Sequence, residues 1–358
     1  MRRHKHRNRR RSKQGKIIII TSICLLFIMT AGYAAFSTNL KLRAATNIKC
    51  NPISIEKLKE SKVTTGSGLY ENTYGYYESS FFYKGINPNN YILFNAEMWR
   101  IINIQPDNAI KIVKNEPLNS PLNFDYSNTR FTNNNYCSSV NSQGNNGCNL
   151  FGSTKETISG GNIMTMMPYR TDDLTKKISG PSSISYLNKY LNNEYYSSLS
   201  SKEKKYIISY NYDYGLLPTM YQRSSYDISN LLYLTRRFYG TYFVAIPKLT
   251  DYVLASTYTG CGSDSYYVSE ECTKAAAKEN WMYDNFHNFW LINPLEYKVG
   301  NSYYTYKNAA VSSKTGGIIQ VNSYQNNPNV YVKPVLFLTS EIKLCGKGTK
   351  EAPYMIWN

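Results

Sequence analysis

Histidine is scarce in this chain: three occur among 358 residues, and only His287 lies beyond the first ten. No CxxC pair is present either. Zinc sites of the common kinds combine closely spaced cysteines with a second such pair or with histidines. The sequence therefore predicts no metal site, and its cysteines need another explanation.

Motifs of catalysis are also missing. The chain has no GxSxG, no HExxH and no glycine-rich phosphate loop. His287 stands among aromatic residues in YDNFHNFW, so we expect a packed or half-buried side chain rather than a general base. Asp172 and Asp173 are adjacent, and adjacent side chains generally point apart, which disfavours an acid/base pair. We predict no catalytic residues, no cofactor and no enzymatic activity.

Two stretches of equal length begin and end with cysteine. CSSVNSQGNNGC occupies residues 137–148 and CGSDSYYVSEEC occupies residues 261–272, and both have polar interiors. Closing a loop of about a dozen residues removes roughly 3 kcal/mol of unfolded-state entropy, so a disulfide suits each pair. Asp264, Glu270 and Glu271 fit no EF-hand spacing, which favours a solvated acidic loop over a calcium site.

Six of the seven cysteines lie outside an apolar run that contains Cys24. These six are Cys50, Cys137, Cys148, Cys261, Cys272 and Cys345. Six cysteines allow fifteen pairings. With the two local pairs closed, Cys50 and Cys345 are left for a third disulfide, because the termini of a domain often lie close together.

The amino terminus is strongly basic, with nine Lys or Arg and no acid in residues 1–16. Residues 17–36 form an uncharged apolar run that, as a helix, spans about 30 Å, the hydrocarbon thickness of a bilayer. Basic residues ahead of such a run typically stay in the cytoplasm. We predict a single-pass cell-membrane protein with a cytoplasmic tail (1–16), a transmembrane anchor (17–36) and an extracytoplasmic bulk, and no nucleic-acid partner.

A cleaved signal sequence is the alternative to an anchor. Gly32 and Ala34 provide the small residues that a cut after Ala34 requires. Signal peptides have apolar cores of about 7 to 15 residues, so the longer run favours the anchor. Either version places the six cysteines in an oxidising compartment, as disulfides require.

Tyrosine is abundant, with 35 residues. One interpretation is an aromatic, hydrogen-bonding surface for glycans or proteins. The other is a bias of composition, because Tyr, Asn, Lys and Ile all have A- and T-rich codons. The scattered positions of the tyrosines favour the second interpretation. The basic tail accounts for nine units of the net charge of +17, and the moderate remainder indicates no particular partner.

The remaining chain reads as a polar spacer (37–68) and an extracytoplasmic globular domain (69–358) with a loop-rich insertion (115–180). MWRIINI and AIKIVK, joined by QPDN, predict a β-hairpin. FWLINP, GGIIQVNS and VYVKPVLFL predict further strands, and Pro334 within the last indicates an edge or a bulge.

Three short helices are expected. The first is capped by Ser182 or Ser183, and the second by Ser200. The third lies in LTDYVLAS with Thr250 as its cap. The apolar face of the first helix consists of Ile184, Leu187, Leu191 and Tyr195.

Several blocks follow one another between about residues 94 and 356: Trp99-Arg100-Ile101, then SYLNKYLNNEYYSSLSSKEKKYII, YFVAIPKLTDYV, FWLINPLE, GGIIQV, VYVKPVLFL and GKGTKEAPYMI. This order resembles a domain of unknown function common in surface and secreted proteins of Firmicutes. Two blocks are also similar to those of C-type-lectin-like folds of the formylglycine-generating kind. The resemblance implies an α+β fold with irregular sheets, short helices and long disulfide-stapled loops.

The chain departs from that family at two arginines. Ile292-Asn293 stands at one position and Lys333 at the other. A lysine replaces a planar fork of donors with a point charge, which puts a ligand role for Lys333 in doubt.

We therefore expect a non-enzymatic, membrane-anchored binding or adhesion-type domain of a Gram-positive bacterium, with a glycan, protein or cell-wall ligand. An extracytoplasmic enzyme and a structural envelope protein are the alternatives. Binding sites of lectin-like folds lie on loops that a rigid scaffold holds. The expected contact surfaces are the loop 261–272 and the segment after FWLINP, whose tyrosines are Tyr297, Tyr303, Tyr304 and Tyr306.

Overall fold

A computed structural model describes residues 50–71, 81–125, 151–152, 184–213, 239–258, 270–299, 302–322 and 329–357. The chain divides into two compact units, Met1–Asn51 and Pro52–Asn358. The second unit is an α+β fold of mixed sheets with few short helices, as expected. Ile55 and Leu58, which fall in the expected spacer, are buried in the core of this unit, so the folded part begins before residue 69.

The larger sheet has ten strands among the described residues. Their order is β15-β16-β3-β4-β5-β14-β6, with β2 beside β4, β1 beside β2 and β9 beside β14. The strands are β1 (Gly68–Glu71), β2 (Phe81–Lys84), β3 (Tyr91–Phe94), β4 (Glu97–Ile104), β5 (Ile110–Lys114), β6 (Ile207–Ile208), β9 (Val244–Ala245), β14 (Val335–Leu338), β15 (Lys343–Cys345) and β16 (Tyr354–Trp357). β4 and β5 are buried along almost their whole length, polar residues included, because other elements cover both faces of these central strands.

The hairpin predicted from the sequence is confirmed by β4 and β5. The two strands pair antiparallel, with Ile104 opposite Ile110. In the turn between them Asn108 has a φ of 67°, a left-handed conformation that asparagine tolerates. Asp107 Oδ1 accepts a hydrogen bond from the N–H of Ala109 at 3.0 Å, which closes the turn.

The smaller sheet has the order β12-β11-β10-β13. Its strands are β10 (Asn288–Val299), β11 (Ser302–Val311), β12 (Ile318–Asn322) and β13 (Val330–Tyr331), and a separate two-stranded sheet consists of β7 (Tyr210–Asp213) and β8 (Tyr239–Tyr242). VYVKPVLFL is divided between the two main sheets: β13 pairs with β10, whereas β14 lies between β5 and β6. Pro334 lies in the link, where its carbonyl accepts the N–H of Lys114 at 2.9 Å, so the expectation of an edge or bulge was wrong.

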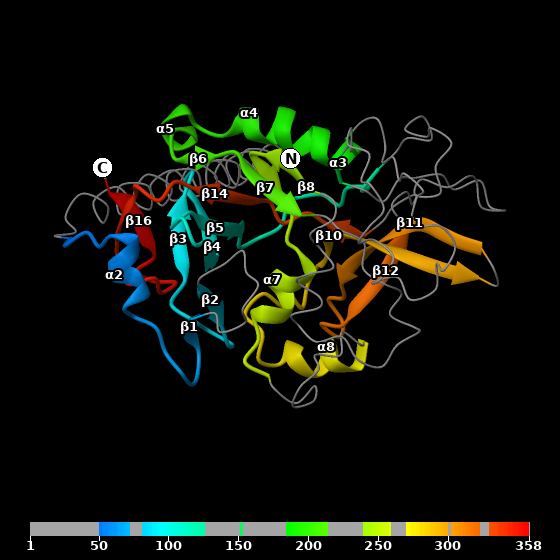
Figure 1. Ribbon diagram of the computed structural model, residues 1–358, viewed down its shortest axis with the longest axis horizontal. Helices are drawn as coiled ribbons and strands as arrows, with labels where there is room; N and C mark the ends of the chain where they lie inside the picture. Colours follow the sequence, from blue (N-terminus) through cyan, green and yellow to red (C-terminus); the bar gives the residue numbers. More distant parts are fainter. Residues whose placement is uncertain are drawn as a thin grey trace, which may run out of the picture. The chain divides into compact units, whose positions relative to one another are not determined.

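The helices are short. They are α2 (Ile55–Lys59), α3 (Tyr186–Lys189), a π-helical turn (Tyr190–Tyr195), α4 (Tyr196–Ser198), α5 (Ser201–Lys204), α7 (Leu249–Leu254) and α8 (Glu270–Ala277). Among the residues described, no helix combines the length and apolar character that a bilayer crossing requires. The predicted anchor, residues 17–36, lies outside them. Figure 1 shows α3 to α5 in a row beside β6 and β14, and α7 lies between β2 and β10, which it contacts.

Two helix caps differ from those expected. Ser185 caps α3 through its hydroxyl, whereas residues 182 and 183 lie outside the described ranges. In α7 the N-cap is Lys248, whose N–H donates to Asp251 Oδ2 at 2.8 Å, and Thr250 lies within the first turn. Asp251 therefore does the capping that we expected of Thr250. Ser200 caps α5 as expected.

The core joins the sheets through buried aromatic rings. Trp99 of β4 and Trp290 of β10 are both fully buried. Trp290 Nε1 donates to the Leu122 carbonyl at 2.7 Å, and its ring packs edge-on against Phe124 with 5.7 Å between centroids. Buried rings of this size dominate core energetics, so these contacts fix the segment after β5 onto β10.

Candidate functional site

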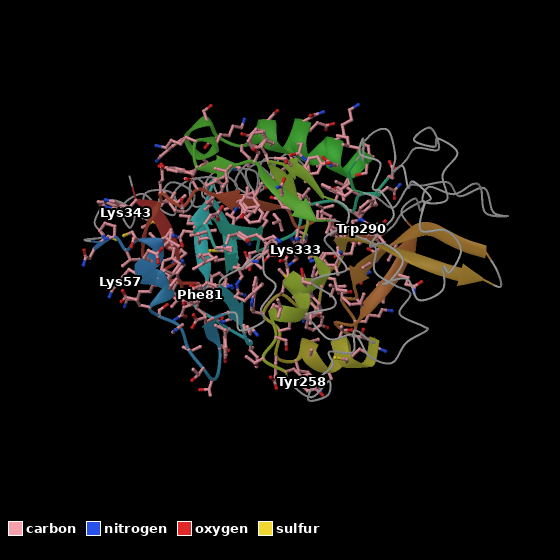
Figure 2. All side chains as sticks on the ribbon, viewed as in Figure 1. Lys57, Phe81, Tyr258, Trp290, Lys333 and Lys343 are labelled. Atoms are coloured by element: carbon pink, nitrogen blue, oxygen red, sulfur yellow. The ribbon has the colours of Figure 1, made fainter. Side chains whose placement is uncertain are left out.

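A buried lysine marks the junction between the two main sheets. Lys333 lies in the link between β13 and β14, and Figure 2 shows it between the larger and the smaller sheet. Its Nζ is 3.1 Å from Asp284 Oδ2, donates to the Asn115 carbonyl at 2.9 Å and lies 5.2 Å from the centre of the Phe289 ring. The lysine therefore ties together the segment after β5, the loop before β10 and the β13–β14 link.

The two charges of this pair respond differently to their surroundings. Burial lowers the pKa of Lys333, and together with the positive charge of Arg100 it outweighs the attraction to Asp284 and Glu116. Burial also acts to raise the pKa of Asp284, but Lys333 and two backbone N–H groups bring it below its ordinary value of 3.8. The side chains of Lys333 and Asp284 are only 8% and 9% exposed, so either charge alone would be costly there.

Asp284 also fixes the backbone that follows it. Its Oδ1 accepts hydrogen bonds from the N–H groups of Phe286 at 2.9 Å and His287 at 3.1 Å. The Nδ1 atom of His287 lies 3.3 Å from the other carboxylate oxygen. Short polar side chains stabilise turns in this way, by replacing backbone acceptors. In this 284–287 loop Phe286 is 80% exposed, so a rigid turn holds a large apolar ring in solvent.

Polar atoms beside the loop are used within the protein. Asn288 Oδ1 accepts hydrogen bonds from the N–H and the hydroxyl of Ser313, at 2.8 and 3.0 Å. The His287 ring packs edge-on against Tyr331, with 4.6 Å between centroids, and both residues are half-buried. The loop therefore carries an aromatic patch, formed by Phe286, His287 and Tyr331, on a backbone that hydrogen bonds hold in place.

Arg100 supports the segment from which the loop starts. Its guanidinium lies between the rings of Tyr91 and Trp281, 4.1 and 4.6 Å from their centroids. Its Nε donates to Asn90 Oδ1 at 2.8 Å, and Trp281 Nε1 donates to the Tyr83 carbonyl at 2.7 Å. These contacts hold Trp281 against the larger sheet, so the 284–287 loop begins from a fixed point.

The four tyrosines expected to contact a ligand lie in the β10–β11 hairpin. Tyr297 belongs to β10, and Tyr303, Tyr304 and Tyr306 belong to β11. Tyr297 pairs with Tyr304 across the ladder, so the hairpin brings their backbones together. Their role in binding stays a prediction. Residues 261–269 of the other expected surface lie outside the described ranges.

Disulfide bonding is confirmed, whereas its connectivity stays a prediction. Within the described ranges, Cys50, Cys272 and Cys345 are disulfide-bonded. Outside the described ranges lie Cys24, Cys137, Cys148 and Cys261. Within the second unit Ile53 and Leu344 exchange two backbone hydrogen bonds, of 2.9 and 2.8 Å. The pairing of Cys50 with Cys345 stays a prediction.

The two positions at which the chain departs from the resembling family are both buried. Asn293 Oδ1 accepts the N–H of Leu249 at 2.7 Å, so this residue joins β10 to the start of α7. Lys333 joins the segments named above. Both side chains are used in contacts within the protein.

His287 and Asp284 have one feature of catalytic sites. A carboxylate beside Nδ1 orients a histidine that acts as a general base. In the part of the chain that the structure describes, no hydroxyl or thiol hydrogen-bonds to His287, and no three His, Cys, Asp or Glu side chains converge as metal ligands do.

Sequence reasoning found part of this site. It expected a packed or half-buried His287, and the ring is half-buried. It missed Asp284 and Phe286, although an aspartate two residues ahead of the aromatic in YDNFH is a local signal for a capped turn. The pairing of Asp284 with Lys333 could not be predicted from local sequence, because it joins segments that lie far apart in the chain.

The chain matches no protein-family model, no curated protein and no solved structure.

Proposed function

We propose that the protein is a non-enzymatic binding or adhesion-type domain displayed outside the cytoplasm, and that the 284–287 loop belongs to its contact surface. The observation that carries this proposal is the 80% exposure of Phe286 on a backbone that Asp284 fixes. Burying a phenylalanine ring against a partner contributes on the order of 2 kcal/mol of binding free energy, relative to leaving it in water. A rigid loop also loses little conformational entropy when a partner binds.

The ligand classes that suit this surface are a glycan, a protein or a cell-wall component. The faces of aromatic rings stack on sugars and pack on apolar protein side chains. The patch formed by Phe286, His287 and Tyr331 offers such rings together with one imidazole. Nucleic acid is not among the proposed partners, because the basic residues 1–16 stand directly ahead of an apolar run, where such residues typically set membrane topology.

The family and the finer fold are part of the proposal. The order of sequence blocks supports a C-type-lectin-like arrangement and membership in the Firmicutes domain of unknown function. The α+β fold, its short helices and its bonded cysteines are compatible with both. In such folds a rigid scaffold carries the binding loops.

We also propose that residues 17–36 anchor the protein in the cell membrane with the amino terminus in the cytoplasm. The basic residues 1–16 and the apolar run support this orientation. Protease added to wall-stripped cells should digest the bulk of the chain and leave the basic tail protected. A mature form that starts at Ala35 in the medium would identify a cleaved signal sequence instead.

The binding proposal is tested with the full-length protein in detergent, applied to a glycan array, to purified cell-wall sacculi and to immobilised surface proteins. For whichever probe is bound, Phe286→Ser should weaken binding by about tenfold or more, because buried aromatic contacts dominate interfaces. The control is Trp357→Ala, which removes another exposed aromatic side chain (47%) from β16. Equal binding by the wild type and Phe286→Ser, with both folded, would exclude the loop from the contact surface.

An extracytoplasmic enzyme is the second candidate, because His287 Nδ1 lies 3.3 Å from the Asp284 carboxylate. A binding domain returns its ligand unchanged, whereas an enzyme alters it. Mass spectrometry of ligand recovered after incubation separates the two functions. A chemical change that the wild type causes and His287→Asn does not would establish the enzyme and exclude the binding domain.

A further inference from the structure

The end of the larger sheet that consists of β15, β16 and β3 carries exposed apolar side chains. Trp357 in β16 is 47% exposed, and Leu93 in the neighbouring β3 is 39% exposed. Leu93 lies opposite Met355, two residues before Trp357, so the three side chains lie on the same face of the sheet. We call these three residues the Trp357 strip. Contiguous exposed apolar side chains mark interaction surfaces, whereas single ones need no explanation.

Lysines flank the Trp357 strip. Lys343 in β15 lies directly opposite Trp357, and Lys347 and Lys350 lie in the turn that leads to β16. All three lysines are exposed. A single acid, Glu351, lies in the same hairpin, which therefore has a net positive charge. Lysines beside an apolar strip are typical of surfaces that bind anionic lipid headgroups.

The helix at this end of the second unit does not cancel that charge. In α2 Lys57 forms an ion pair with Glu60, and Lys59 forms one with Glu56. Figure 2 shows Lys57 and Lys343 at the same end of the unit. The two pairs leave α2 neutral, so the positive charge of the β15–β16 hairpin is the net charge of this surface.

The chain reaches this end directly from the proposed membrane anchor. Ile53, near the start of the second unit, exchanges two backbone hydrogen bonds with Leu344 in β15, of 2.9 and 2.8 Å. β16 follows β15 in the sheet, so about two strand spacings, roughly 10 Å, separate Ile53 from Trp357. Residues 37–52 join the anchor (17–36) to Ile53, and a chain spans at most about 3.6 Å per residue, or about 60 Å here. This tether keeps the Trp357 strip at a high local concentration beside the bilayer.

We propose that the Trp357 strip and the lysines of the β15–β16 hairpin dock onto the lipid surface of the membrane in which residues 17–36 are anchored. This inference rests on the proposed anchor. Tryptophan favours the boundary between headgroups and acyl chains, and lysine places its ammonium group among anionic headgroups. Figure 1 shows α2 and β16 at one end of the second unit and β11 and β12 at the other. Docking through β16 therefore directs the β10–β11 hairpin, with its expected contact tyrosines, away from the bilayer.

The test uses the tryptophans of the protein as probes. The chain has four: Trp99 and Trp290 are fully buried, Trp281 is 7% exposed and Trp357 is 47% exposed. The full-length protein is reconstituted into vesicles of brominated phosphatidylcholine and phosphatidylglycerol, whose bromine atoms quench tryptophan fluorescence on contact. We expect quenching in the wild type and the loss of most of it in Trp357→Phe. Equal quenching in both proteins, or none in either, would overturn the docking.

Matched lysine variants test the electrostatic part. Lys343→Glu should reduce the quenching of Trp357, because it places a negative charge directly opposite the ring. Lys314→Glu makes the same change at an exposed lysine between β11 and β12, and it should leave the quenching as in the wild type. Equal quenching in the two variants would contradict a role for the lysines of the hairpin.

Flotation of the same vesicles in high salt separates this result from the anchor. A helix across the bilayer keeps the protein with the vesicles in salt, whereas salt screens a contact between surface charges. Protein that floats while Trp357 stays unquenched would leave the anchor in place and overturn the docking. Protein that does not float in high salt would contradict the anchor on which the docking rests.

Discussion

Tyr252 donates its hydroxyl hydrogen to the carbonyl oxygen of Gly316 at 2.7 Å and thereby joins α7 to the turn between β11 and β12. Gly316 has a φ of 67°, a conformation that favours glycine. A Cβ atom at this position would collide with the Cβ of Ala277 in α8. The turn therefore fits against two helices only because residue 316 has no side chain.

Gly316→Ala should lower the free energy of unfolding by about 2 to 4 kcal/mol, because it combines left-handed strain with overpacking. Gly66→Ala is the matched control: Gly66 has a φ of 73°, but no atom lies within 4 Å of its added Cβ. The free energy of unfolding of this control should fall by only about 1 to 2 kcal/mol, from left-handed strain alone. Urea denaturation measures both losses, and equal losses would show that the collision with Ala277 is relieved at no cost.

Lys333→Met should lower the free energy of unfolding by about 3 to 5 kcal/mol, because it leaves the Asp284 carboxylate buried without its partner. The control is Lys62→Met, which removes one partner of the ion pair between Lys62 and Glu71. Both side chains of that pair are about half exposed. That control should cost less than about 1 kcal/mol, since water screens such pairs. Chemical denaturation of both variants tests the difference, and similar losses would contradict a buried role for Lys333.

The contribution of Asp284 should depend on pH. Its pKa in the folded protein is lower than the ordinary value of 3.8, so the folded state favours the carboxylate. This stability is complete above the ordinary value and is lost as the pH falls through the lowered pKa. The difference in urea midpoint between the wild type and Asp284→Asn should be constant near neutral pH and shrink on acidification. A difference that grows toward acid would contradict this sign.

All six cysteines outside the apolar run should resist alkylation in denaturant before reduction and react after it. Cys50, Cys272 and Cys345 are disulfide-bonded, and the sequence predicts the same of the remaining three. Mass spectrometry of the alkylated peptides measures this directly. A free Cys137 or Cys261 would contradict the stapled loops.

Replacing Tyr303 and Tyr304 together with Ala should weaken binding with little change in melting temperature. Tyrosine provides contact area while ordering few rotors, and both residues lie in the β10–β11 hairpin. Binding and thermal unfolding are measured on the same preparation. A clear fall in melting temperature would mean that these rings belong to the core.

Local signals explain which elements could be predicted. The β4–β5 hairpin follows from two β-branched runs around Pro106 and Asp107, and Ser200 is a serine directly ahead of a helix. The Lys248 cap could not be found this way, because lysine is not a capping residue and the bond comes from Asp251 three positions later. Thr250 has the better capping propensity, but it lies within the first turn of α7 instead of at its N-cap.

Long-range partners explain what could not be predicted. VYVKPVLFL suits one buried strand as well as two short ones, and its division depends on β10 and β5, which belong to distant segments. Lys333 places a point charge where the resembling family has the planar fork of an arginine, and its single ammonium contacts both the Asp284 carboxylate and the Asn115 carbonyl. The candidate site depends on this contact, which pattern alone does not reveal.

The division of VYVKPVLFL also limits how the protein moves. Only Val332, Lys333 and Pro334 separate a strand of one sheet from a strand of the other, and all three are buried. Pro334 fixes one dihedral of this link, its carbonyl accepts the Lys114 N–H, and the Asp284 carboxylate holds the side chain of Lys333. A hinge needs residues that absorb large changes in dihedral angle, and the three residues of this link are held in place. The two sheets should therefore move as one body, and a partner would meet a surface already shaped before contact.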